Sequence, residues 1–210
     1  MFRFTSPLYA IYPGPVDGPP SVESTVTALC RAGVSLIQYR ETTLDDARML
    51  SVARRIARAA LPWKVPVVVN DRADIAALAG AAGAHLGQED LPVAEARGLL
   101  GPGAIVGVSV DTAEEARRAA EGGADYVSLG PAYPTTSKAD VPEPRPIELY
   151  EQLAGELPIP LVAIGGITAA NATPLARAGV AAVAVISSLY TGSDPGKNAV
   201  ELIRAFRGGD

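Results

Sequence analysis

The chain has 210 residues, 48% of them hydrophobic, which is enough for one substantial domain with a well-buried core. Its net charge of −5, with 23 acidic and 18 basic residues, excludes a general attraction to nucleic acid or anionic membranes. The single cysteine excludes an internal disulfide, and no apolar run approaches the roughly 18 residues that span a bilayer. We expect one domain over residues 1–210 in the reducing cytoplasm, with no nucleic-acid or membrane partner.

The first half of the chain alternates short β-prone runs with segments of helical spacing. Strands are predicted at 8–12, 34–39, 67–69 and 83–86, and helices at 21–32, 44–60, 73–81 and 92–99. Ser21 is the candidate N-cap of the first helix, and Gly33 suits its C-cap. Each strand is therefore expected to lead directly into a helix.

The second half continues the same alternation. Strands are predicted at 104–108, 125–129, 160–164 and 180–186, and helices at 112–121, from 147 to about 157, at 168–178 and at 198–206. Thr112 and Glu115 have the spacing of a capping box. The segment 130–146 contains five prolines and is too long for a simple connector, so we interpret it as a functional loop.

The number of strand–helix units indicates the architecture. Eight units in 210 residues, without an antiparallel hairpin signal, predict a closed (β/α)8 TIM barrel with parallel strands. An open doubly wound sheet is the alternative, since the strand runs suit burial on both faces in either fold.

Polar or glycine-rich residues follow seven of the eight predicted strands. The carboxyl ends of parallel strands lie at one edge, where barrels and open α/β sheets bind their ligands. We expect the following residues to face one bowl: Arg40-Glu41, Asn70-Asp71, Gln88-Glu89-Asp90, Ser109, Thr135 to Lys138, Gly165-Gly166 and Ser187-Ser188.

Asp71 and Asp90 follow neighbouring strands, and two carboxylates so placed can hold a hard divalent ion. Mg²⁺ is the expected cofactor, because it takes few protein ligands and keeps waters for a substrate phosphate. The alternative is that each aspartate caps the helix after it. Their placement at one edge weakens that alternative.

Gly165 and Gly166 stand between a predicted strand and a predicted helix, where backbone N–H groups can surround a phosphate. The pair could also be a simple tight turn. Ser187 and Ser188 strengthen the phosphate interpretation, because barrels commonly bind phosphate after strands seven and eight. The long loop adds three hydroxyls and an ammonium, unless it is only a solvated polar loop, at Thr135, Thr136, Ser137 and Lys138.

His85 is the only histidine, and it lies inside a predicted strand. A histidine so placed is more often a satisfied core residue than a catalyst. We therefore leave His85 out of the predicted site.

Taken in chain order, these residues resemble the thiamine phosphate synthase family, to which the thiazole tautomerases are related. The segments that carry the resemblance are Gln38-Tyr39-Arg40-Glu41, Asn70-Asp71-Arg72, His85 to Pro92, Gly107-Val108-Ser109, Ala124-Asp125-Tyr126, Gly130-Pro131, Pro134 to Lys138 and Ile164 to Ile167. No single segment is decisive, but the ordered set is specific.

The resemblance implies a Mg²⁺-dependent transferase with small phosphorylated substrates. Such an enzyme joins 4-amino-5-hydroxymethyl-2-methylpyrimidine diphosphate to hydroxyethylthiazole phosphate and releases pyrophosphate. It further implies Asp71 and Asp90 as metal ligands and Arg40, Lys138 and Ser109 as catalytic residues. The implied substrate contacts are Gln38, Tyr39, Arg40, Glu41, Thr42, Asn70, Ser109, Thr135, Thr136, Ser137, Lys138, Gly165, Gly166, Ile186 and Ser187.

The chain departs from the family pattern at three places. Thr42 stands where the family commonly has lysine, so either Lys64 or Arg72 replaces that cation or the affinity for the diphosphate falls. The loop reads Thr-Thr-Ser-Lys instead of Thr-Pro-Thr-Lys, which keeps the hydroxyls. The tautomerases rely on a histidine shortly after the position of Ser109, where this chain has Val110-Asp111. The synthase is favoured. Two alternatives stay open, namely a tautomerase-like paralogue and a non-catalytic regulatory protein that binds thiazole phosphate. A homo-oligomer is also open.

Overall fold

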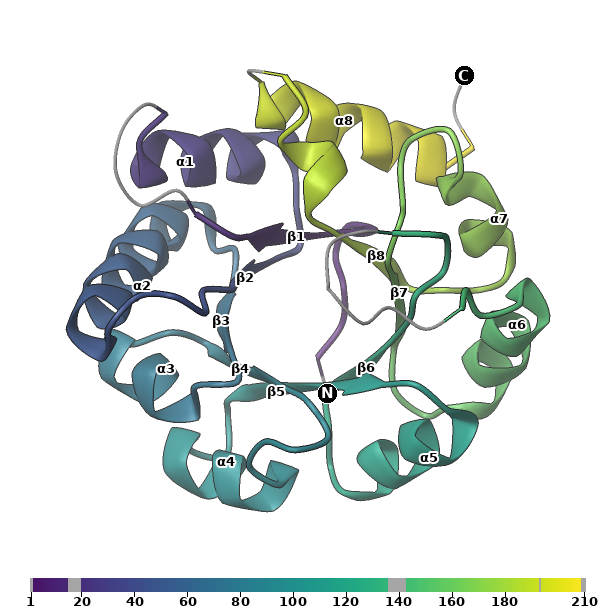
Figure 1. The fold of residues 1–210 in the computed structure, drawn as a ribbon, viewed down its shortest axis with the longest axis horizontal. Coiled ribbons are helices and arrows are strands. Elements are labelled where there is room, and N and C mark those ends of the chain that lie inside the picture. Colours follow the sequence, from purple (N-terminus) through teal and green to yellow (C-terminus); the bar gives the residue numbers. More distant parts are fainter. Residues whose placement is uncertain (1, 15–19, 136–142, 193, 209–210) are drawn as a thin grey trace.

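The computed structural model is a closed barrel of parallel strands surrounded by helices (Figure 1). It describes residues 2–14, 20–135, 143–192 and 194–208. Each strand pairs with the next along the chain, and β8 pairs with β1. The strands are β1 (Leu8–Tyr12), β2 (Leu36–Tyr39), β3 (Val67–Asn70), β4 (Gly83–Leu86), β5 (Ile105–Val110), β6 (Tyr126–Leu129), β7 (Leu161–Ile164) and β8 (Ala182–Val185). The predicted (β/α)8 TIM barrel is confirmed, and the pairing of β1 with β8 excludes the open sheet.

A helix follows each strand and packs on the outside of the barrel (Figure 1). The α-helices are α1 (Val22–Ala32), α2 (Asp46–Ala60), α3 (Ala73–Ala79), α4 (Val93–Leu100), α5 (Ala113–Glu121), α6 (Ile147–Glu156), α7 (Ala172–Arg177) and α8 (Pro195–Phe206). Short 3-10 helices follow α2 and β8, and they are η1 (Leu61–Trp63) and η2 (Ser187–Leu189). Within the described part of the chain, no helix combines the length and the hydropathy that a membrane span requires.

Alternate residues of the strands point to two separate cores, as the period of two in a β-strand requires. The outer core lies between strands and helices. The inner core fills the barrel and consists of Tyr9, Ile11, Leu36, Val68, Tyr126, Val162, Ala182 and Ala184. Phe4 packs edge-on against Tyr126 with ring centroids 5.5 Å apart, so the segment before β1 covers the amino-terminal end of the barrel. The carboxyl-terminal end is therefore the end at which a ligand can enter.

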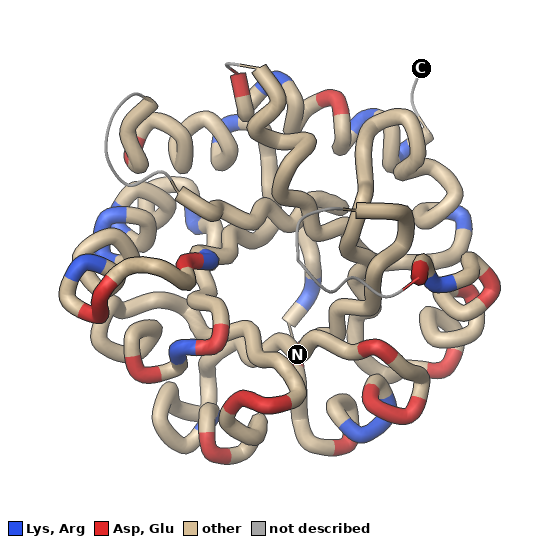
Figure 2. Tube along the Cα trace, viewed as in Figure 1, with Lys and Arg blue, Asp and Glu red and all other residues tan. Residues whose placement is uncertain are grey.

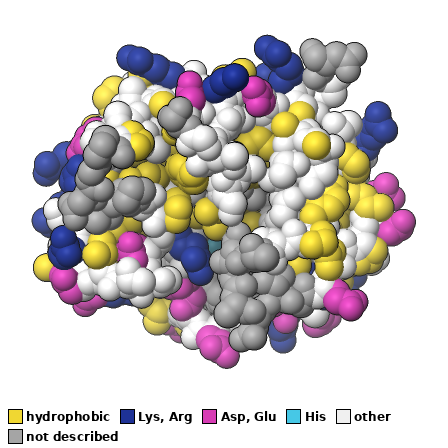
Figure 3. All heavy atoms as spheres, turned by 45° about the horizontal axis from the view of Figure 1, so that its top comes forward, with side chains coloured by type: hydrophobic (Ala, Val, Ile, Leu, Met, Phe, Trp, Pro, Cys, Tyr) yellow, Lys and Arg dark blue, Asp and Glu magenta, His cyan; other side chains and the backbone are white. Residues whose placement is uncertain are grey.

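Charge is kept out of the barrel wall. None of the eight described strands contains Lys, Arg, Asp or Glu. Charged residues lie on the helices and in the connecting segments (Figure 2), and both signs are interspersed on the face shown in Figure 3. This distribution agrees with the burial of both faces of the strands.

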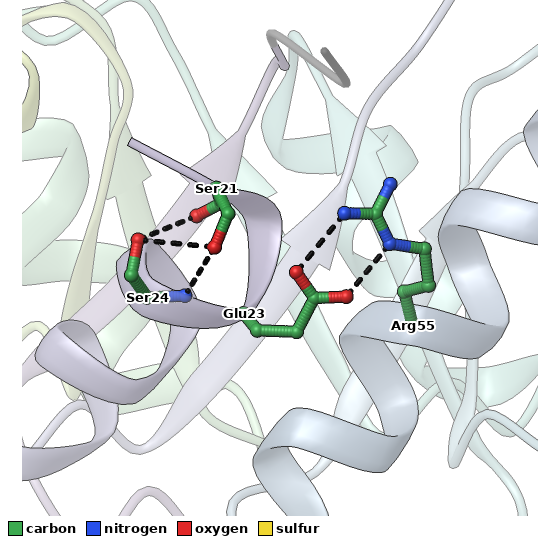
Figure 4. A network of polar contacts seen from close by, with 4 residues as sticks. All are labelled: Ser21, Glu23, Ser24 and Arg55. Carbon is green, nitrogen blue, oxygen red and sulfur yellow. Dashed lines mark hydrogen bonds and ion pairs between the residues drawn. The ribbon is translucent and has the colours of Figure 1, made fainter. Parts of the chain in front are cut away.

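Two helix starts and one helix end follow the predicted caps. The Ser21 side chain accepts a hydrogen bond from the backbone N–H of Ser24 (Figure 4). Gly33 ends α1 with a φ of 90°. At α5 the Thr112 hydroxyl accepts from the N–H of Glu115 at 3.2 Å. The sequence signals at these three residues are confirmed.

Two helices begin three or more residues away from their predicted starts. The helix expected from residue 168 begins at Ala172, because the Asn171 side chain accepts from the N–H of Thr168 and donates to the carbonyl of Gly166. The helix expected from residue 198 begins at Pro195, where the Asp194 carboxylate accepts from the N–H of Lys197. Asp-Pro at this position is a helix-start signal that the sequence analysis missed.

The ion pair between α1 and α2 predicts a pH dependence of stability. Arg55 donates to Glu23 at 2.7 Å, and this contact lowers the pKa of Glu23 from its ordinary 4.5 to about 2 (Figure 4). Because the folded-state pKa is depressed, the contribution is present above pH 4.5 and is lost as the pH falls towards 2. Both side chains are more than a third exposed, so solvent screening limits it to about 1 kcal/mol or less.

The free energy of unfolding should fall less steeply in Glu23→Gln than in the wild type between pH 4.5 and about pH 2. The difference should be about 1 kcal/mol or less. Urea denaturation at several pH values measures the effect. Glu151→Gln removes an exposed glutamate from α6 and serves as the control, which should keep the wild-type slope. An unchanged slope in Glu23→Gln would contradict the prediction.

Candidate active site

The closed barrel brings the predicted site residues to its carboxyl-terminal rim. Because all strands are parallel, their carboxyl ends meet at one end of the barrel. Residues of the predicted site that are described at or after these ends are Arg40, Glu41, Thr42, Asn70, Asp71, Asp90, Thr135, Gly165, Gly166, Ile186 and Ser187. Thr136, Ser137 and Lys138 lie outside the described residues. Ser109 lies within β5 instead of after it.

Side-chain alternation separates two neighbouring residues that were both predicted to contact substrate. Gln38 points into the barrel, where its Nε2 donates to the hydroxyl of Tyr9. Tyr39 points the opposite way and packs in the outer core. Its hydroxyl has no hydrogen-bond partner among the described residues. The Tyr39 side chain therefore lies on the opposite side of the barrel wall from Gln38.

A chain of hydrogen bonds crosses the barrel interior beneath the rim. It runs from Gln38 to the Tyr9 hydroxyl and then to the Tyr126 hydroxyl at 2.8 Å. The Tyr126 hydroxyl contacts His85 Nδ1 at 2.9 Å, and His85 Nε2 contacts Ser109 Oγ at 2.9 Å. Burial raises the pKa of both phenols above its usual value, so each carries its proton at neutral pH. The chain ends at Gln38 and Ser109, two of the predicted substrate contacts.

His85, Tyr9 and Tyr126 were not predicted as part of this site. His85 does behave as a satisfied buried residue, as expected from the sequence, but its partner Ser109 makes it part of the bowl floor. Strand parity could have found it, because Asn70 and His85 are register partners on β3 and β4. Ser128 is register partner to Ser109 on β6, and its buried hydroxyl has no partner among the described residues.

Asp71 and Asp90 lie in the loops after the adjacent strands β3 and β4. Asp71 adopts a left-handed φ of 59°, and its N–H donates to the carbonyl of His85 at 2.8 Å. Asp90 accepts the N–H of Gly87 at 2.6 Å through Oδ2. The N-cap residues of α3 and α4 are Arg72 and Pro92, so neither aspartate occupies the capping position that was the alternative.

The described residues contain no cluster of three or more His, Cys, Asp or Glu side chains that would form a complete metal cage. Carboxylates on adjacent strand ends still fit Mg²⁺, because this ion commonly takes one or two protein carboxylates and completes its shell with water and substrate phosphate. The donor set therefore suits an ion that arrives with a phosphorylated ligand.

The loop after β2 is organised by Glu41. One carboxylate oxygen, Oε1, accepts from the N–H of Thr42, the N–H of Thr43 and the hydroxyl of Thr43, each at 2.7 Å. Burial opposes ionisation, but these hydrogen bonds hold the pKa of Glu41 below its usual value. Glu41 thus fixes the backbone on which the exposed Thr42 side chain stands.

Neither suggested replacement for the family lysine is well placed. Lys64 precedes β3 and so lies towards the amino-terminal end of the barrel, away from the rim. Arg72 lies beside the rim but pairs with Asp46 at 2.6 Å and with Asp74 at 2.7 Å. Its hydrogen bonds to these two carboxylates raise its pKa and commit its guanidinium to the outer surface.

Gly165 and Gly166 make room for the loop after β6. A Cβ on Gly166 would lie 2.5 Å from the carbonyl oxygen of Pro134, and one on Gly165 would lie 2.6 Å from Pro131 Cβ. Both residues have positive φ values, 98° and 64°. The pair is followed by a turn instead of the predicted helix start, and Ser188 ties the loops after β7 and β8 by donating to the carbonyl of Ile167 at 2.8 Å.

Comparison with known proteins gives a consistent result. The family model described as thiamine monophosphate synthase matches residues 8–189. The thiamine-phosphate synthase of Shouchella clausii is 42% identical over 164 residues, which cover 78% of each chain. The thiamine biosynthesis bifunctional protein ThiM/ThiE of Symbiobacterium thermophilum is 42% identical over 200 residues, and the match spans 95% of this chain and 41% of that longer relative. The solved thiamine phosphate pyrophosphorylase from Pyrococcus furiosus superimposes with a TM-score of 0.84 at 32% identity and 98% coverage of both chains.

The packing of Gly166 predicts a large stability loss on substitution. Gly166→Ala must tolerate both a left-handed backbone and the clash with Pro134, whereas Gly80→Ala has a similar φ of 69° with nothing within 4 Å. We expect Gly80→Ala to lose about 1 kcal/mol of unfolding free energy and Gly166→Ala to lose a further 1–3 kcal/mol or so. Denaturant unfolding measures both losses. Equal losses in the two variants would contradict the prediction, because they would show that the loop at Pro134 moves aside without destabilising the protein.

Proposed function

The chain belongs to the thiamine monophosphate synthase family, and we propose that it couples 4-amino-5-hydroxymethyl-2-methylpyrimidine diphosphate to hydroxyethylthiazole phosphate. The products are thiamine phosphate and pyrophosphate. The observation that carries this proposal is the bowl itself, in which a polar floor from Gln38 to Ser109 lies below two carboxylates on adjacent strand ends. Free Cys30 is buried and unbridged, so we also place the reaction in the reducing cytoplasm.

The floor of the bowl suits the pyrimidine ring. Gln38 on β2, Asn70 on β3 and Ser109 on β5 offer an amide, a second amide and a hydroxyl, on a wall that carries no charge. Such groups orient a neutral heterocycle by hydrogen bonds without attracting its charged part. The diphosphate is thereby directed towards the rim, where the charged residues stand.

The reaction needs stabilisation of a leaving group and no protein nucleophile. The bond between the pyrimidine methylene carbon and the diphosphate oxygen breaks, and the thiazole nitrogen forms the new bond to that carbon. The electron pair leaves with pyrophosphate, and the pyrimidine amino group delocalises the charge left on the ring. Arg40 and Lys138 would stabilise the departing diphosphate electrostatically.

A divalent ion fits the rim beside these cations. Asp71 and Asp90 would hold Mg²⁺, and the ion would neutralise charge on the diphosphate when bound. Gly165, Gly166, Ile186 and Ser187, with the hydroxyls at 135–137, would hold the thiazole phosphate. Ser188 supports this side by tying the loops after β7 and β8 together.

We predict release of pyrophosphate only when both substrates and Mg²⁺ are present. Asp71→Ala and Lys138→Ala should each abolish turnover and leave the protein folded, because they remove charge from the site and not from the core. Asp46→Ala is the control, since it removes an aspartate whose side chain is 74% exposed and pairs with Arg72. Chelation of Mg²⁺ should also stop turnover.

Near-normal rates in both Asp71→Ala and Lys138→Ala would refute this assignment of the site. No pyrophosphate at saturating substrates would refute the synthase. Calorimetry with each substrate alone would then identify a paralogue that binds thiazole phosphate without coupling it.

Thr42→Lys tests the departure from the family pattern. The exposed side chain at this position stands on the loop held by Glu41, and the structure offers neither Lys64 nor Arg72 as a replacement cation. A charge-assisted contact is worth about 1.5 to 3 kcal/mol, so KM for the pyrimidine diphosphate should fall roughly 10- to 100-fold. Steady-state kinetics measure it, and Ser51→Lys on α2 controls for added charge. A KM equal to that of the control would contradict the prediction.

A further inference from the structure

The hydrogen-bonded chain in the barrel interior connects five residues from five different strands. They are Gln38 on β2, Tyr9 on β1, Tyr126 on β6, His85 on β4 and Ser109 on β5. Both phenols are fully buried, Gln38 is 2% exposed and His85 is 5% exposed, so water does not compete for these groups. Ser109, at one end of the chain, is partly exposed, and Gln38 forms the other end. The inner members therefore act on a ligand only through the two ends.

Counting protons along this chain gives it a direction. Gln38 donates to the Tyr9 oxygen, and the Tyr9 proton then goes to its other partner, Tyr126. Tyr126 accepts from Tyr9, so its own proton goes to His85 Nδ1. A neutral imidazole with Nδ1 as acceptor carries its proton on Nε2, which donates to Ser109 Oγ. The serine proton is left to point into the bowl.

The surrounding packing holds Tyr126 in this position. A Cβ on Gly107 would lie 2.1 Å from Tyr126 Cζ, so β5 reserves the space of a side chain for this phenol ring. The rings of His85 and Tyr126 stack with centroids 5.5 Å apart and an interplanar angle of 25°. Phe4 also packs edge-on against the Tyr126 ring. The packing therefore holds the phenol oxygen within reach of Tyr9 and His85.

We propose that Tyr126 is a positioning residue, which through His85 fixes Ser109 as a hydrogen-bond donor towards the substrate pyrimidine. The identity of the substrate rests on the proposed function above. A donating hydroxyl selects an unprotonated ring nitrogen, which is the acceptor that an aminopyrimidine carries. Tyr126 itself does not touch the substrate. Reversal of the Gln38 amide would reverse every bond and make Ser109 an acceptor, so the direction is a testable property of the chain.

The tautomer of His85 reports this direction without any variant. His85 is the only histidine, so protein labelled with ¹⁵N-histidine gives imidazole signals from one residue. A multiple-bond ¹H–¹⁵N spectrum at neutral pH distinguishes the two tautomers and the imidazolium. We expect the proton on Nε2 and none on Nδ1. A proton on Nδ1, on both nitrogens, or an equal mixture of tautomers would overturn the proposal.

Tyr126→Phe then tests the consequence for the substrate. Loss of the hydroxyl should remove the tautomer preference of His85 and raise KM for the pyrimidine diphosphate about tenfold, the factor for one hydrogen bond of about 1.4 kcal/mol. KM for the thiazole phosphate should stay within about twofold, which a general loss of structure would not produce. An unchanged pyrimidine KM, or equal increases in both KM values, would overturn the proposal.

Tyr150→Phe is the matched control. It removes an equally buried tyrosine hydroxyl, which donates to the carbonyl of Leu129 at 3.2 Å, from the outer core instead of the barrel interior. Its stability loss should resemble that of Tyr126→Phe, while the His85 spectrum and both KM values stay at wild-type values. If the wild-type protein released no pyrophosphate, the proposed function would fail, whereas the His85 spectrum would still decide the direction of the chain.

Discussion

Pairing of β1 with β8 is the constraint on which the candidate site depends. Closure turns the sheet edge into a ring, so that residues from β2, β3, β4 and β8, far apart in the chain, stand around one opening. An open sheet would place β1 and β8 at opposite edges or beside other partners, and the rim would lose its continuity. The barrel interior must then be filled from within, which brings Tyr9 and Tyr126 to the centre.

Filling that interior with tyrosine has a chemical consequence. A buried hydroxyl without a partner costs roughly 1–3 kcal/mol, so two phenols in the barrel require acceptors and donors close by. Gln38 and His85 form hydrogen bonds with the two phenol hydroxyls, and His85 also forms one with Ser109 at the bowl. The same hydrogen bonds therefore satisfy the buried phenols of the barrel core and position the side chain of Ser109. The aromatic ring of Phe4 completes it from the amino-terminal end.

The sequence was sufficient for the fold because each strand and helix carries a local signal. Hydrophobic runs, caps such as Ser21 and terminators such as Gly33 locate the elements, and their number indicates the barrel. The rim followed from strand ends alone. Details that depend on particular side-chain and loop contacts did not follow from the sequence. The late start of α7, at Ala172, is decided by the Asn171 side chain, and the role of Gly166 by the loop that packs on it. The outward direction of Tyr39 could have been predicted from Gln38 by alternation.

The charge around the rim shows why the position of Thr42 matters. Asp71, Asp90 and Glu41 bring negative charge to the end of the barrel where a diphosphate is proposed to bind, and the chain as a whole carries −5. Arg72 adds little, because two carboxylates on α2 and α3 already hold its guanidinium. Under the proposed function, Arg40, Lys138 and a divalent ion would together offset the Coulomb repulsion between the ligand and these acids. With threonine in place of a lysine, the proposed ion would carry a larger share of that charge compensation, and binding of the diphosphate should depend on the ion more steeply than in a relative that keeps the lysine.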